Sequence, residues 1–547
     1  MEPRPLPTRA KRHDALDRGP LDVLVVGGGI TGAGLGLDLA LRGLRTAVVE
    51  RGDWAAATSS ASSRLIHGGL RYLEQFEFGL VRESCLERGL LLRNAAGMVW
   101  PERFLFPLHR KHGPGQLKLA AGLGLYTFVS LPRVLGLPRM HGRGRVSEWL
   151  PGVEMHGLQG GGSYLDGASD DSRLTLAVVK AALAQGCTCL SRMEMRAIEG
   201  GENGAQVELV DRLTGERRTQ QAARVVLCGG PFTEALRARA GLSGTWVQPT
   251  RGSHILIPRE RLPTDGAIIF PSCVDGRVLF LLPWPRYTII GTTDLDASPD
   301  DEVRATEEEV RYLIDSANGL VPRAALTFDD VVSSWAGLRP LLASQTDDPS
   351  ARSREERVEQ EGPIYTIAGG KLTGYRVMAE KLGARVARDL GRGNGSKHSP
   401  TRTYLLPGAF ERPVQRPGWS TQAPRTDDEA LVQAWTRRYA AFQPAVAELC
   451  GRVEEGRRAL DAETLLGEVD WAVRFEDCLA AEDFLLRRTD LGYGPRERVE
   501  GLLGDILERL AGKLAWTAER LAEEERAVRT VLEGLHGWRR PSLARPA

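Results

Sequence analysis

Residues 21–34 read LDVLVVGGGITGAG and decide the fold of this chain. Five of the first six are apolar and three of these are valine, which is typical of a buried strand. Gly27, Gly29 and Gly32 then form a GxGxxG pattern ahead of a leucine-rich stretch that favours a helix. A second strand is predicted over residues 46–49, TAVV, and it ends at Glu50, 18 positions after Gly32. Strand, glycine turn, helix, strand and acid, in that order, predict a dinucleotide-binding unit.

Each residue of this pattern has a chemical reason. Gly27 permits the tight turn, Gly29 lets the backbone approach a pyrophosphate, and Gly32 lets the helix pack closely on the strand. The helix N-terminus offers unpaired N–H groups and a partial positive charge to the phosphates. Glu50 can accept hydrogen bonds from a ribose diol, and its charge disfavours a 2′-phosphate. A glycine-rich turn alone predicts little, but both strands and Glu50 together predict a dinucleotide site.

The composition is that of a globular protein. The 547 residues are 42% hydrophobic and 26% charged, and 72 basic side chains balance 71 acidic ones, so no bulk charge favours nucleic acid. A chain of this length suggests two to four domains. The seven cysteines are scattered, without a CxxC pair or a Cys/His cluster, so we expect no disulfide framework and no metal site. The longest nearly uncharged stretch, residues 119–131, is too short to span a bilayer.

A hydroxyl-rich segment follows the acid. Residues 55–64 read AAATSSASSR and residues 65–74 read LIHGGLRYLE. A serine cluster is usually a solvated loop, but here apolar residues, a glycine pair and an arginine come directly after it. This stretch resembles the TSSxSSxLIHGGLRYLE signature of FAD-dependent glycerol-3-phosphate dehydrogenases, and the match from Thr58 to Glu74 is nearly unbroken.

Further motifs resemble the same family, in the same order. They are YLD at 164–166, DDSRL at 170–174, RGSHILI at 251–257, IIGTTD at 289–294, GLRPL at 337–341 and GGKLT at 369–373. The resemblance covers residues 21–408, and a weaker echo continues to the end and includes FLLRRT at 484–489. Two positions depart from the family. LCGGPF at 227–232 replaces Asn-Ala-x-Gly-x-Trp but keeps its glycine, and Gly374 replaces a threonine, which removes one hydroxyl from the substrate site.

The resemblance implies an α/β flavoprotein with a Rossmann-like FAD domain of the glutathione-reductase/D-amino-acid-oxidase type, an antiparallel-sheet substrate domain and a C-terminal helical domain. The Pro- and Arg-rich N-terminus predicts a disordered tail, the Pro/Thr/Gly-rich stretch after the FAD domain a linker, and the charged, periodic C-terminal part a set of helices. The expected boundaries are 1–20 for the tail; 21–95, 164–242 and 331–390 for the FAD domain; 96–163 and 243–330 for the substrate or cap domain; 401–425 for the linker; and 426–547 for the helical domain.

The resemblance also implies which residues contact FAD. They belong to the glycine turn, the acid, the hydroxyl-rich segment and the later glycine motifs. The set is Gly27, Gly29, Ile30, Thr31, Gly32, Glu50, Arg51, Thr58, Ser59, Ser60, Ser63, His67, Gly68, Gly69, Leu70, Gly229, Gly370, Lys371, Leu372 and Thr373. A helix expected over residues 375–390 would direct its N-terminus at the flavin pyrimidine ring and favour the anionic reduced flavin.

Glycerol 3-phosphate carries a dianion, which calls for fixed positive charge. Arg71 and Arg339 lie in motifs of small or apolar residues, where an unpaired guanidinium is costly to bury, so we interpret them as phosphate ligands. Tyr72, Lys371 and Thr373 complete the expected substrate site, and Lys371 would contact the phosphate or the developing alkoxide. His254 can take the hydroxyl proton. We therefore expect His254, Arg339 and Lys371 to be catalytic, and the general base stays open between His254 and Lys371.

The expected reaction oxidises sn-glycerol 3-phosphate to dihydroxyacetone phosphate, with electrons passing to a membrane quinone. Three alternatives stay open: an oxidase that uses oxygen, a dehydrogenase of amines or 2-hydroxy acids, and a flavin-binding protein without turnover. Residues 117–129 are apolar and lie among Arg110, Lys111, Lys118, Arg133 and Arg139, so they predict either an interfacial membrane anchor or a buried helix. The resemblance implies a cytoplasmic protein, peripheral on the inner face of the cell membrane, and leaves a homodimer open.

Overall fold

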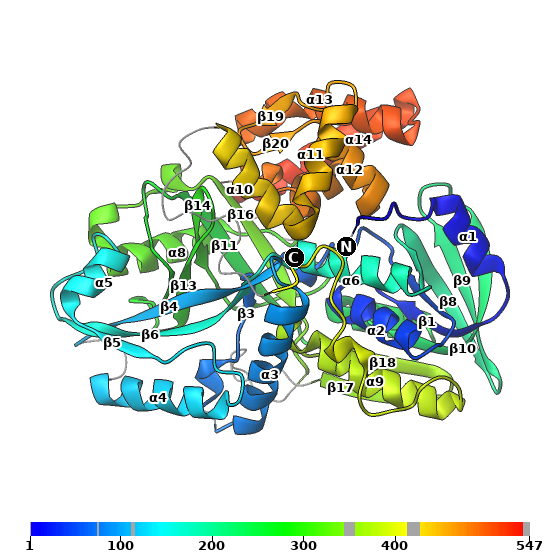
Figure 1. The fold of residues 1–547 in the computed structure, drawn as a ribbon, viewed down its shortest axis with the longest axis horizontal. Helices are drawn as coiled ribbons and strands as arrows, with labels where there is room; N and C mark the ends of the chain where they lie inside the picture. Colours follow the sequence, from blue (N-terminus) through cyan, green and yellow to red (C-terminus); the bar gives the residue numbers. More distant parts are fainter. Residues whose placement is uncertain (1, 74–75, 111–114, 344–355, 413–426, 540–547) are drawn as a thin grey trace, which may run out of the picture.

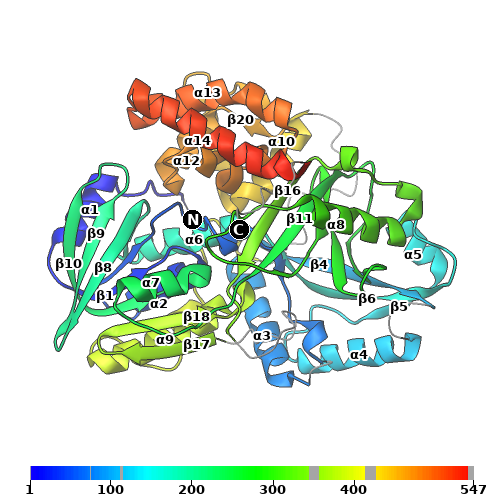
Figure 2. The same cartoon turned by 180° about the vertical axis from the view of Figure 1, so that it is seen from behind.

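The computed structural model of the chain describes residues 2–73, 76–110, 115–343, 356–412 and 427–539, and the side chain of Arg71 lies outside this description. Two sheets lie side by side, and a helical C-terminal unit covers the junction between them (Figures 1 and 2). This is the expected flavoprotein architecture, with one sheet for the glycine turn, a second sheet beside it and helices at the C-terminus.

The first sheet carries the glycine turn. Its central strands are parallel and buried on both faces, so they read as continuous apolar runs. Among the described residues the order is β17-β18-β10-β1-β2-β7, with β9 on β10 and β8 on β9. The bounds are β1 Leu21–Val26, β2 Thr46–Val49, β7 Thr188–Leu190, β8 Met193–Gly201, β9 Gly204–Asp211, β10 Arg217–Leu227, β17 Glu356–Glu361 and β18 Ile364–Gly369.

Helices cover this sheet. On one face α2 (Ile30–Leu41) packs between α6 (Asp171–Ala184) and α9 (Tyr375–Leu390), and their apolar residues share one core with Val23, Val25 and Val48. On the other face lie β8, β9 and α7 (Thr233–Arg239). The expected helix over 375–390 is confirmed at both ends, and Gly391, at φ +61°, closes it in the left-handed region that favours glycine.

The second sheet is mostly antiparallel, apart from the parallel pair β4·β12. Its order is β15-β11-β14-β13-β12-β4-β6-β3, with β16 on β11 and β5 on β6. The strands are β3 Leu65–Ile66, β4 Val99–His109, β5 Arg139–His141, β6 Leu158–Ser169, β11 Thr250–Pro258, β12 Ala267–Pro271, β13 Val278–Pro283, β14 Tyr287–Gly291, β15 Leu295–Asp296 and β16 Ser333–Arg339. The helices beside it are α3 Phe78–Asn94, α4 Gln116–Val129, α5 Arg143–Trp149 and α8 Glu307–Leu320.

Two expected domain boundaries move. The whole of β6 pairs with β4, so residues up to Ser169 belong to the second sheet and the boundary expected at 164 is wrong. Likewise β16 pairs with β11, so residues 333–339 are not part of the FAD sheet as expected. Both segments are rich in small residues, as a strand of either sheet could be, and only the pairing partner separates the two assignments.

The C-terminal unit is helical as expected. Its helices are α10 Asp427–Tyr439, α11 Gln443–Arg452, α12 Gly467–Glu476, α13 Arg496–Leu514 and α14 Ala518–His536. A short hairpin, β19 (Ala459–Asp461) with β20 (Thr464–Leu465), and a π-helical turn over Asp483–Arg488 interrupt them. The expected linker is only partly described, and within that part Thr401, Leu406 and Ala409 are buried, so residues 401–412 pack against the rest of the chain.

The disordered tail expected over residues 1–20 is wrong for its second half. Residues Arg9–Asp17 form α1, in which Arg12 is buried and pairs with Asp477 of the C-terminal unit. Leu16 is buried in the core beside β1. The prolines and arginines of this segment predict a solvated tail. The ion pair with Asp477, which is distant in sequence, instead holds α1 against the rest of the chain.

No helix among the described residues is long and apolar enough to cross a membrane.

Candidate active site

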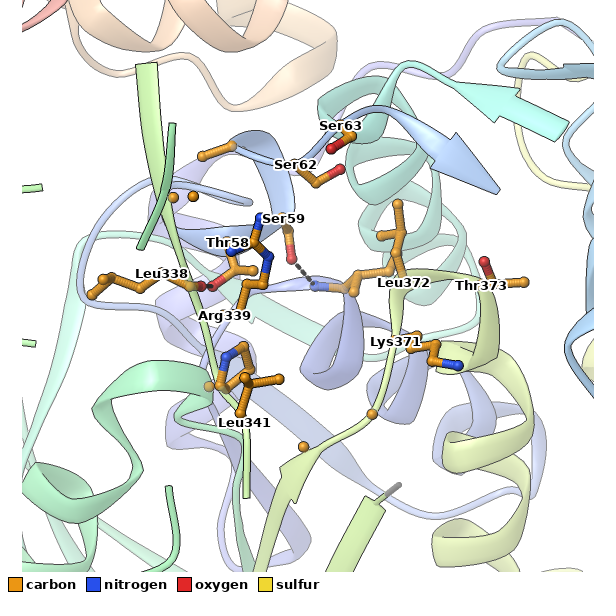
Figure 3. Close-up of a pocket in the computed structure, with 18 of the residues that line it drawn as sticks. Thr58, Ser59, Ser62, Ser63, Leu338, Arg339, Leu341, Lys371, Leu372 and Thr373 are labelled. Atoms are coloured by element: carbon orange, nitrogen blue, oxygen red, sulfur yellow. Dashed lines mark hydrogen bonds between the residues drawn. The ribbon is translucent and has the colours of Figure 1, made fainter. Parts of the chain in front are cut away.

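A cavity of about 1920 Å³ lies between the two sheets. It collects residues from the glycine turn, the acid after β2, the hydroxyl-rich segment, β11, β16 and the turn after β18. Figure 3 shows the hydroxyl-rich segment, the end of β16 and the turn after β18 around it. The predicted residues that line it are Gly27, Gly29, Ile30, Thr31, Glu50, Arg51, Thr58, Ser59, Ser63, His67, Gly69, Leu70, Tyr72, Gly229, His254, Arg339, Gly370, Lys371, Leu372 and Thr373. Motifs spread over more than 300 residues of chain therefore meet at one cavity.

The glycine turn closes the cavity at the N-terminus of α2. Gly27 has φ +118°, and a Cβ there would lie 2.3 Å from the carbonyl oxygen of Cys228. Gly32 does not line the cavity. A Cβ on it would lie 1.9 Å from the carbonyl oxygen of Gly27, so its role is the close packing of helix on strand that the motif predicts. Both contacts require glycine and leave the helix N-terminus open to an anion.

Glu50 lies directly after β2, and the backbone fixes its carboxylate. Oε2 accepts a hydrogen bond from the N–H of Gly28 at 2.6 Å, and Oε1 accepts one from the N–H of Gly52 at 2.7 Å. Burial raises the pKa of Glu50, and the two backbone N–H groups oppose that shift. The carboxylate keeps lone pairs for a ribose diol, because each oxygen can accept more than one hydrogen bond.

The hydroxyl-rich segment crosses from the first sheet to the second. Ser59 Oγ accepts from the N–H of Ile30 at 3.0 Å, and Thr58 Oγ1 donates to the carbonyl of Leu338 at 2.6 Å (Figure 3). Ser63 Oγ lies 2.8 Å from Nε2 of His254. Ser60, expected at the cofactor, does not line the cavity, and its hydroxyl faces the carbonyl of Ala57 at 3.4 Å. The segment thus connects the glycine turn to strands β11 and β16.

His254 is held rigidly on β11. Its ring stacks on Trp335 with centroids 4.9 Å apart and an interplanar angle of 11°, and the residue is 2% exposed. Burial, together with the positive charges of Arg339 and Arg64, lowers the pKa of His254 to about 3. The imidazole is therefore neutral at neutral pH, which is the state that a proton acceptor requires.

Arg339 projects from the end of β16 and is not an unpaired cation. Its Nη1 donates to Oδ1 of Asp294 at 2.9 Å, and its Nη2 donates to Oγ1 of Thr292 at 2.8 Å and to the carbonyl of Thr293 at 3.2 Å. The expectation of an arginine fork wholly available to a phosphate needs this correction. An arginine has five N–H donors, so at most two remain for a ligand.

Lys371 comes from the turn after β18, where Gly369 and Gly370 both have positive φ. Its Nζ lies 3.7 Å from the centroid of the Tyr72 ring, which brings two predicted substrate residues together. Thr373 Oγ1 donates to the carbonyl of His67 at 3.5 Å. Leu372 and Thr373 precede α9 and line the cavity, so the start of that helix faces it as expected.

Gly68 does not line the cavity, and the side chain of Arg71 is not described. Gly68 is buried behind the wall, where its N–H donates to the hydroxyl of Tyr126 at 3.1 Å. Arg71 lies in the 3₁₀ turn over Leu70–Leu73, but its side chain lies outside the described structure, so its predicted phosphate contact stays a prediction.

Sequence reasoning missed two acids, Asp294 on the cavity wall and Asp171, which accepts a hydrogen bond from the wall residue Ser62. Asp294, the partner of Arg339, ends the IIGTTD motif, and Asp171 lies in DDSRL. Asp171 accepts hydrogen bonds from Ser62 and Ser169, and burial raises its pKa to about 6. Both motifs were identified, but a motif does not say which partner an acid will have. The described residues contain no cluster of His, Cys, Asp and Glu that could hold a metal ion.

Part of the cavity wall is apolar. It comes from α4 and the second sheet together with residue 76, and the side chains are Phe76, Phe104, Phe106, Leu125, Val278 and Phe280. Several apolar side chains of this region are also exposed to solvent, Phe76 at 77%, Leu117 at 85% and Phe128 at 69%. The cavity therefore combines a polar part, with the charged groups above, and an apolar part beside α4.

Two family models match the chain. The model described as FAD dependent oxidoreductase matches residues 22–375, and that of the C-terminal domain of alpha-glycerophosphate oxidase matches residues 399–521. Among curated relatives, the aerobic glycerol-3-phosphate dehydrogenase of Staphylococcus aureus is 30% identical over 541 residues, which cover 95% of this chain and 96% of the relative.

Solved structures extend the comparison. The FAD complex of glycerol-3-phosphate dehydrogenase from Bacillus halodurans matches with a TM-score of 0.78 and 29% identity, over 97% of this chain and 98% of that one. Glycine oxidase from Geobacillus kaustophilus matches with a TM-score of 0.51 and 22% identity, over 71% of this chain and 98% of its own. The second likeness concerns the fold alone.

Proposed function

The chain belongs to the FAD-dependent oxidoreductases, within the family of the aerobic glycerol-3-phosphate dehydrogenases, and on that premise we propose that it oxidises sn-glycerol 3-phosphate to dihydroxyacetone phosphate. The observation that carries the proposal is the meeting of His254, Arg339 and Lys371 on the wall of one cavity with the glycine turn and Glu50. This arrangement combines a dinucleotide site with a neutral base and two cations.

The residues of the cavity fit FAD. The turn at Gly27 and Gly29 leaves no side chain between the start of α2 and a pyrophosphate, and Glu50 can bind the adenosine ribose. Thr58, Ser59 and the Lys371–Thr373 segment also line the cavity and would hold the remainder of the cofactor. When bound, FAD supplies the acceptor for the hydride of the substrate carbon.

The substrate dianion would be held by cations on two walls. Arg339 has at most two N–H donors left after Asp294 and the Thr292–Thr293 pair, and Lys371 offers an ammonium group beside Tyr72. Asp294 and its neighbours fix the direction of the Arg339 guanidinium. The proposed phosphate ligands are therefore Arg71, Arg339 and Lys371, with Tyr72 and Thr373 as hydroxyl partners.

His254 is the better candidate for the proton acceptor. Its ring is neutral because burial and the nearby guanidinium groups lower its pKa, and Nδ1 is buried without a hydrogen-bond partner among the described residues. If the Nε2–H donates to Ser63 Oγ, Nδ1 keeps its lone pair for a proton. Lys371, as a cation, would instead stabilise the developing alkoxide.

Anaerobic reduction tests the reaction. Adding sn-glycerol 3-phosphate to the yellow holoenzyme without oxygen should bleach the flavin band, and glycerol at the same concentration should leave it unchanged, because it lacks the phosphate that the cations hold. Bleaching by an amine or a 2-hydroxy acid instead would assign the cations to a carboxylate. A band that no substrate bleaches would indicate a flavin protein without turnover.

We further propose a membrane quinone as the electron acceptor. The apolar part of the cavity, with Phe76, Phe106 and Phe280, suits a flat apolar ring better than it suits a polar acceptor. A water-soluble quinone should restore the flavin band of the reduced enzyme faster than air does. Peroxide formed under air at the rate of substrate turnover would assign the chain to the oxidases.

The same region would provide a peripheral contact with the inner face of the cell membrane. Leu117 and Phe128 of α4 are largely exposed, and Arg133 and Arg139 lie nearby in the chain; Lys111 lies outside the described residues. Exposed apolar side chains flanked by cations suit an anionic bilayer surface.

Vesicle pelleting tests this contact. The holoenzyme should pellet with anionic lipid vesicles at low salt, and Leu117→Asp with Phe128→Asp should abolish pelleting. Val432→Asp, at an exposed apolar residue of α10, is the matched control and should pellet like the original chain. Pelleting that survives the double change in α4 would place the membrane contact elsewhere.

A further inference from the structure

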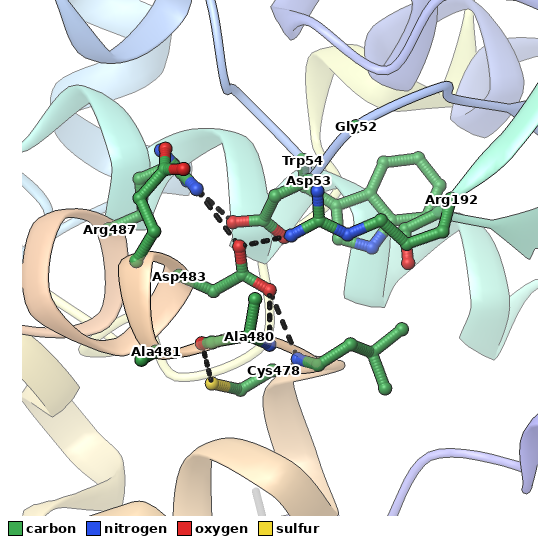
Figure 4. Close-up of polar contacts among 12 residues, drawn as sticks. Gly52, Asp53, Trp54, Arg192, Cys478, Ala480, Ala481, Asp483 and Arg487 are labelled. Carbon is green, nitrogen blue, oxygen red and sulfur yellow. Dashed lines mark hydrogen bonds and ion pairs between the residues drawn. The ribbon is translucent and has the colours of Figure 1, made fainter. Parts of the chain in front are cut away.

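The FLLRRT stretch at 484–489 does not line the cavity, yet its two arginines contact the loop that follows Glu50. Arg488 forks onto Asp53, with Nη1 to Oδ2 at 2.6 Å and Nη2 to Oδ1 at 2.8 Å. Arg487 Nε donates to the same Asp53 Oδ2 at 2.6 Å. Asp53 is three residues after Glu50, so the C-terminal unit holds the loop that follows the predicted ribose ligand (Figure 4).

The cluster is buried and its charged groups are satisfied by one another. Arg487 Nη2 donates to Asp483 Oδ1 at 2.9 Å, and Arg192 Nη2 donates to the same atom at 2.6 Å (Figure 4). Asp53 is 1% exposed, Asp483 0% and Arg488 0%. Burial alone would raise the pKa of Asp53, but Arg488 and Arg487 outweigh it and hold that pKa below its usual range. The two arginines therefore hold Asp53 in its charged state.

The neighbouring residue is tied to the same unit. Trp54 Nε1 donates to Asp477 Oδ2 at 2.9 Å, and its ring lies against Gly28, where a Cβ would come within 2.6 Å of the ring. Gly52, just before this pair, donates its N–H to Glu50 Oε1. The two residues after Gly52 are thus clamped by the C-terminal unit, and Gly52 and Gly28 hold the Glu50 carboxylate.

Burying four charges is an expensive way to join two domains, because apolar side chains of the same volume often stabilise an interface as well or better. What such a cluster adds is direction, since a bidentate arginine fixes both the place and the plane of its carboxylate. Here the arginine fixes Asp53, which lies in the loop whose Gly52 N–H binds the Glu50 carboxylate.

We propose that Asp53, Arg487 and Arg488 are positioning residues for Glu50, so that the C-terminal unit forms part of the binding site for the adenosine half of FAD. The inference rests on the proposed contact between Glu50 and the FAD ribose. Glu50→Gln tests that contact separately: if it binds FAD like the original chain, the contact itself is wrong.

The test is the affinity of the apoprotein for FAD, measured by quenching of flavin fluorescence, with ADP as a competing probe of the adenosine half. Asp53→Asn should weaken both ligands about 10- to 100-fold, as expected when charge-assisted hydrogen bonds are lost. Trp54→Phe removes one hydrogen bond and keeps the ring, so it should weaken both about fivefold. Trp54→Phe also serves if Asp53→Asn does not fold.

Glu476→Gln is the matched control. The Glu476 carboxylate forms an equally buried pair with Arg173 of α6 across the same domain junction and also accepts a hydrogen bond from Trp471. Its backbone carbonyl, which the substitution keeps, accepts the hydrogen bonds from Arg488. The substitution should lower the melting temperature and change FAD and ADP affinity less than twofold. The proposal is overturned if Trp54→Phe and any folded Asp53→Asn protein bind both ligands like the original chain, or if Glu476→Gln weakens binding as much as they do.

Discussion

The proposed role of Arg339 as a phosphate ligand depends on its ion pair with Asp294. The guanidinium is 20% exposed and the carboxylate 14%, so the pair lies at the cavity wall and not in the core. Asp294 cancels part of the positive charge, but it also fixes the plane of the arginine fork. A fixed fork loses little conformational entropy when a phosphate binds, which compensates for the reduced charge.

We predict that Arg339→Met lowers kcat/KM for glycerol 3-phosphate about 10- to 150-fold, because each charge-assisted hydrogen bond contributes about 1.5–3 kcal/mol. Asp294→Asn should lower it less, since the cation remains but is held less firmly. Steady-state kinetics at saturating FAD measure both. Arg452→Met, at an exposed arginine of α11, is the control. Near-normal activity of Arg339→Met would remove Arg339 from the substrate site.

His254 leads to a prediction about stability and pH. Its pKa is about 3 in the folded chain against 6.5 for an unperturbed histidine. Below about pH 6.5 the unfolded chain therefore binds a proton at this residue that the folded chain does not bind. The contribution of the neutral His254 ring to the free energy of unfolding is fully present above about pH 6.5 and is lost as pH falls toward 3. Between about pH 7.5 and 5 this loss amounts to about 2 kcal/mol.

The comparison variant is His254→Asn, which cannot titrate. In urea unfolding followed by flavin release, the original chain should lose about 2 kcal/mol more than the variant on going from about pH 7.5 to 5. The absolute stability of the variant is irrelevant here, because only the difference between the two pH values is compared. Equal losses in both proteins would mean that His254 keeps an ordinary pKa.

At the scale of the element, the β1–α2 unit depends on the contact between Gly32 and Gly27. A Cβ at Gly32 would lie 1.9 Å from the Gly27 carbonyl oxygen, and backbone atoms cannot move away as a side chain can. We predict that Gly32→Ala distorts the glycine turn that would bind the pyrophosphate. The distortion should cost about 1–3 kcal/mol of binding free energy and so weaken FAD binding about 5- to 150-fold.

Flavin content after purification and fluorescence titration of the apoprotein measure this effect. Gly501→Ala is the control: this glycine is exposed on α13, nothing lies within 4 Å of its Cβ position, and alanine should stabilise the helix by up to about 1 kcal/mol. If Gly32→Ala retains its flavin like the control, the prediction is wrong, and the close packing at Gly32 is not needed for FAD binding.

The sequence predicts the elements of this fold better than their partners. β1, α2, β2 and α9 appear where hydrophobic period and glycine signals indicate, because these are local properties. The placement of β6 and β16 in the second sheet depends on pairing, which the strands' own residues do not encode. For the same reason GTTD was found as a motif, but the ion pair of its Asp294 with Arg339 was not predicted.

At the scale of the whole molecule, the C-terminal unit is joined to the FAD sheet by buried charges. Arg173 pairs with Glu476, Arg488 with Asp53, and Arg12 with Asp477. Such pairs are screened little by salt and lose much when one partner is removed. The three pairs approach the C-terminal unit from α6, from the loop after β2 and from α1, so they fix its orientation over the sheet edge.

The pair made by α1 yields the last prediction. Arg12 and Asp477 are 465 residues apart, which is why the sequence suggests a disordered tail, yet both side chains are nearly buried. Arg12 Nη1 also donates to the carbonyl of Cys189 at 3.0 Å, at the edge of the first sheet. Arg12→Ala leaves the Asp477 carboxylate buried without its cation and should destabilise the holoenzyme by about 3–5 kcal/mol. Lys11→Ala, one residue away and exposed, should leave the melting temperature unchanged. If the two variants melt together, α1 does not hold the C-terminal unit to the sheet, and the first twenty residues behave in solution as the tail that their composition suggests.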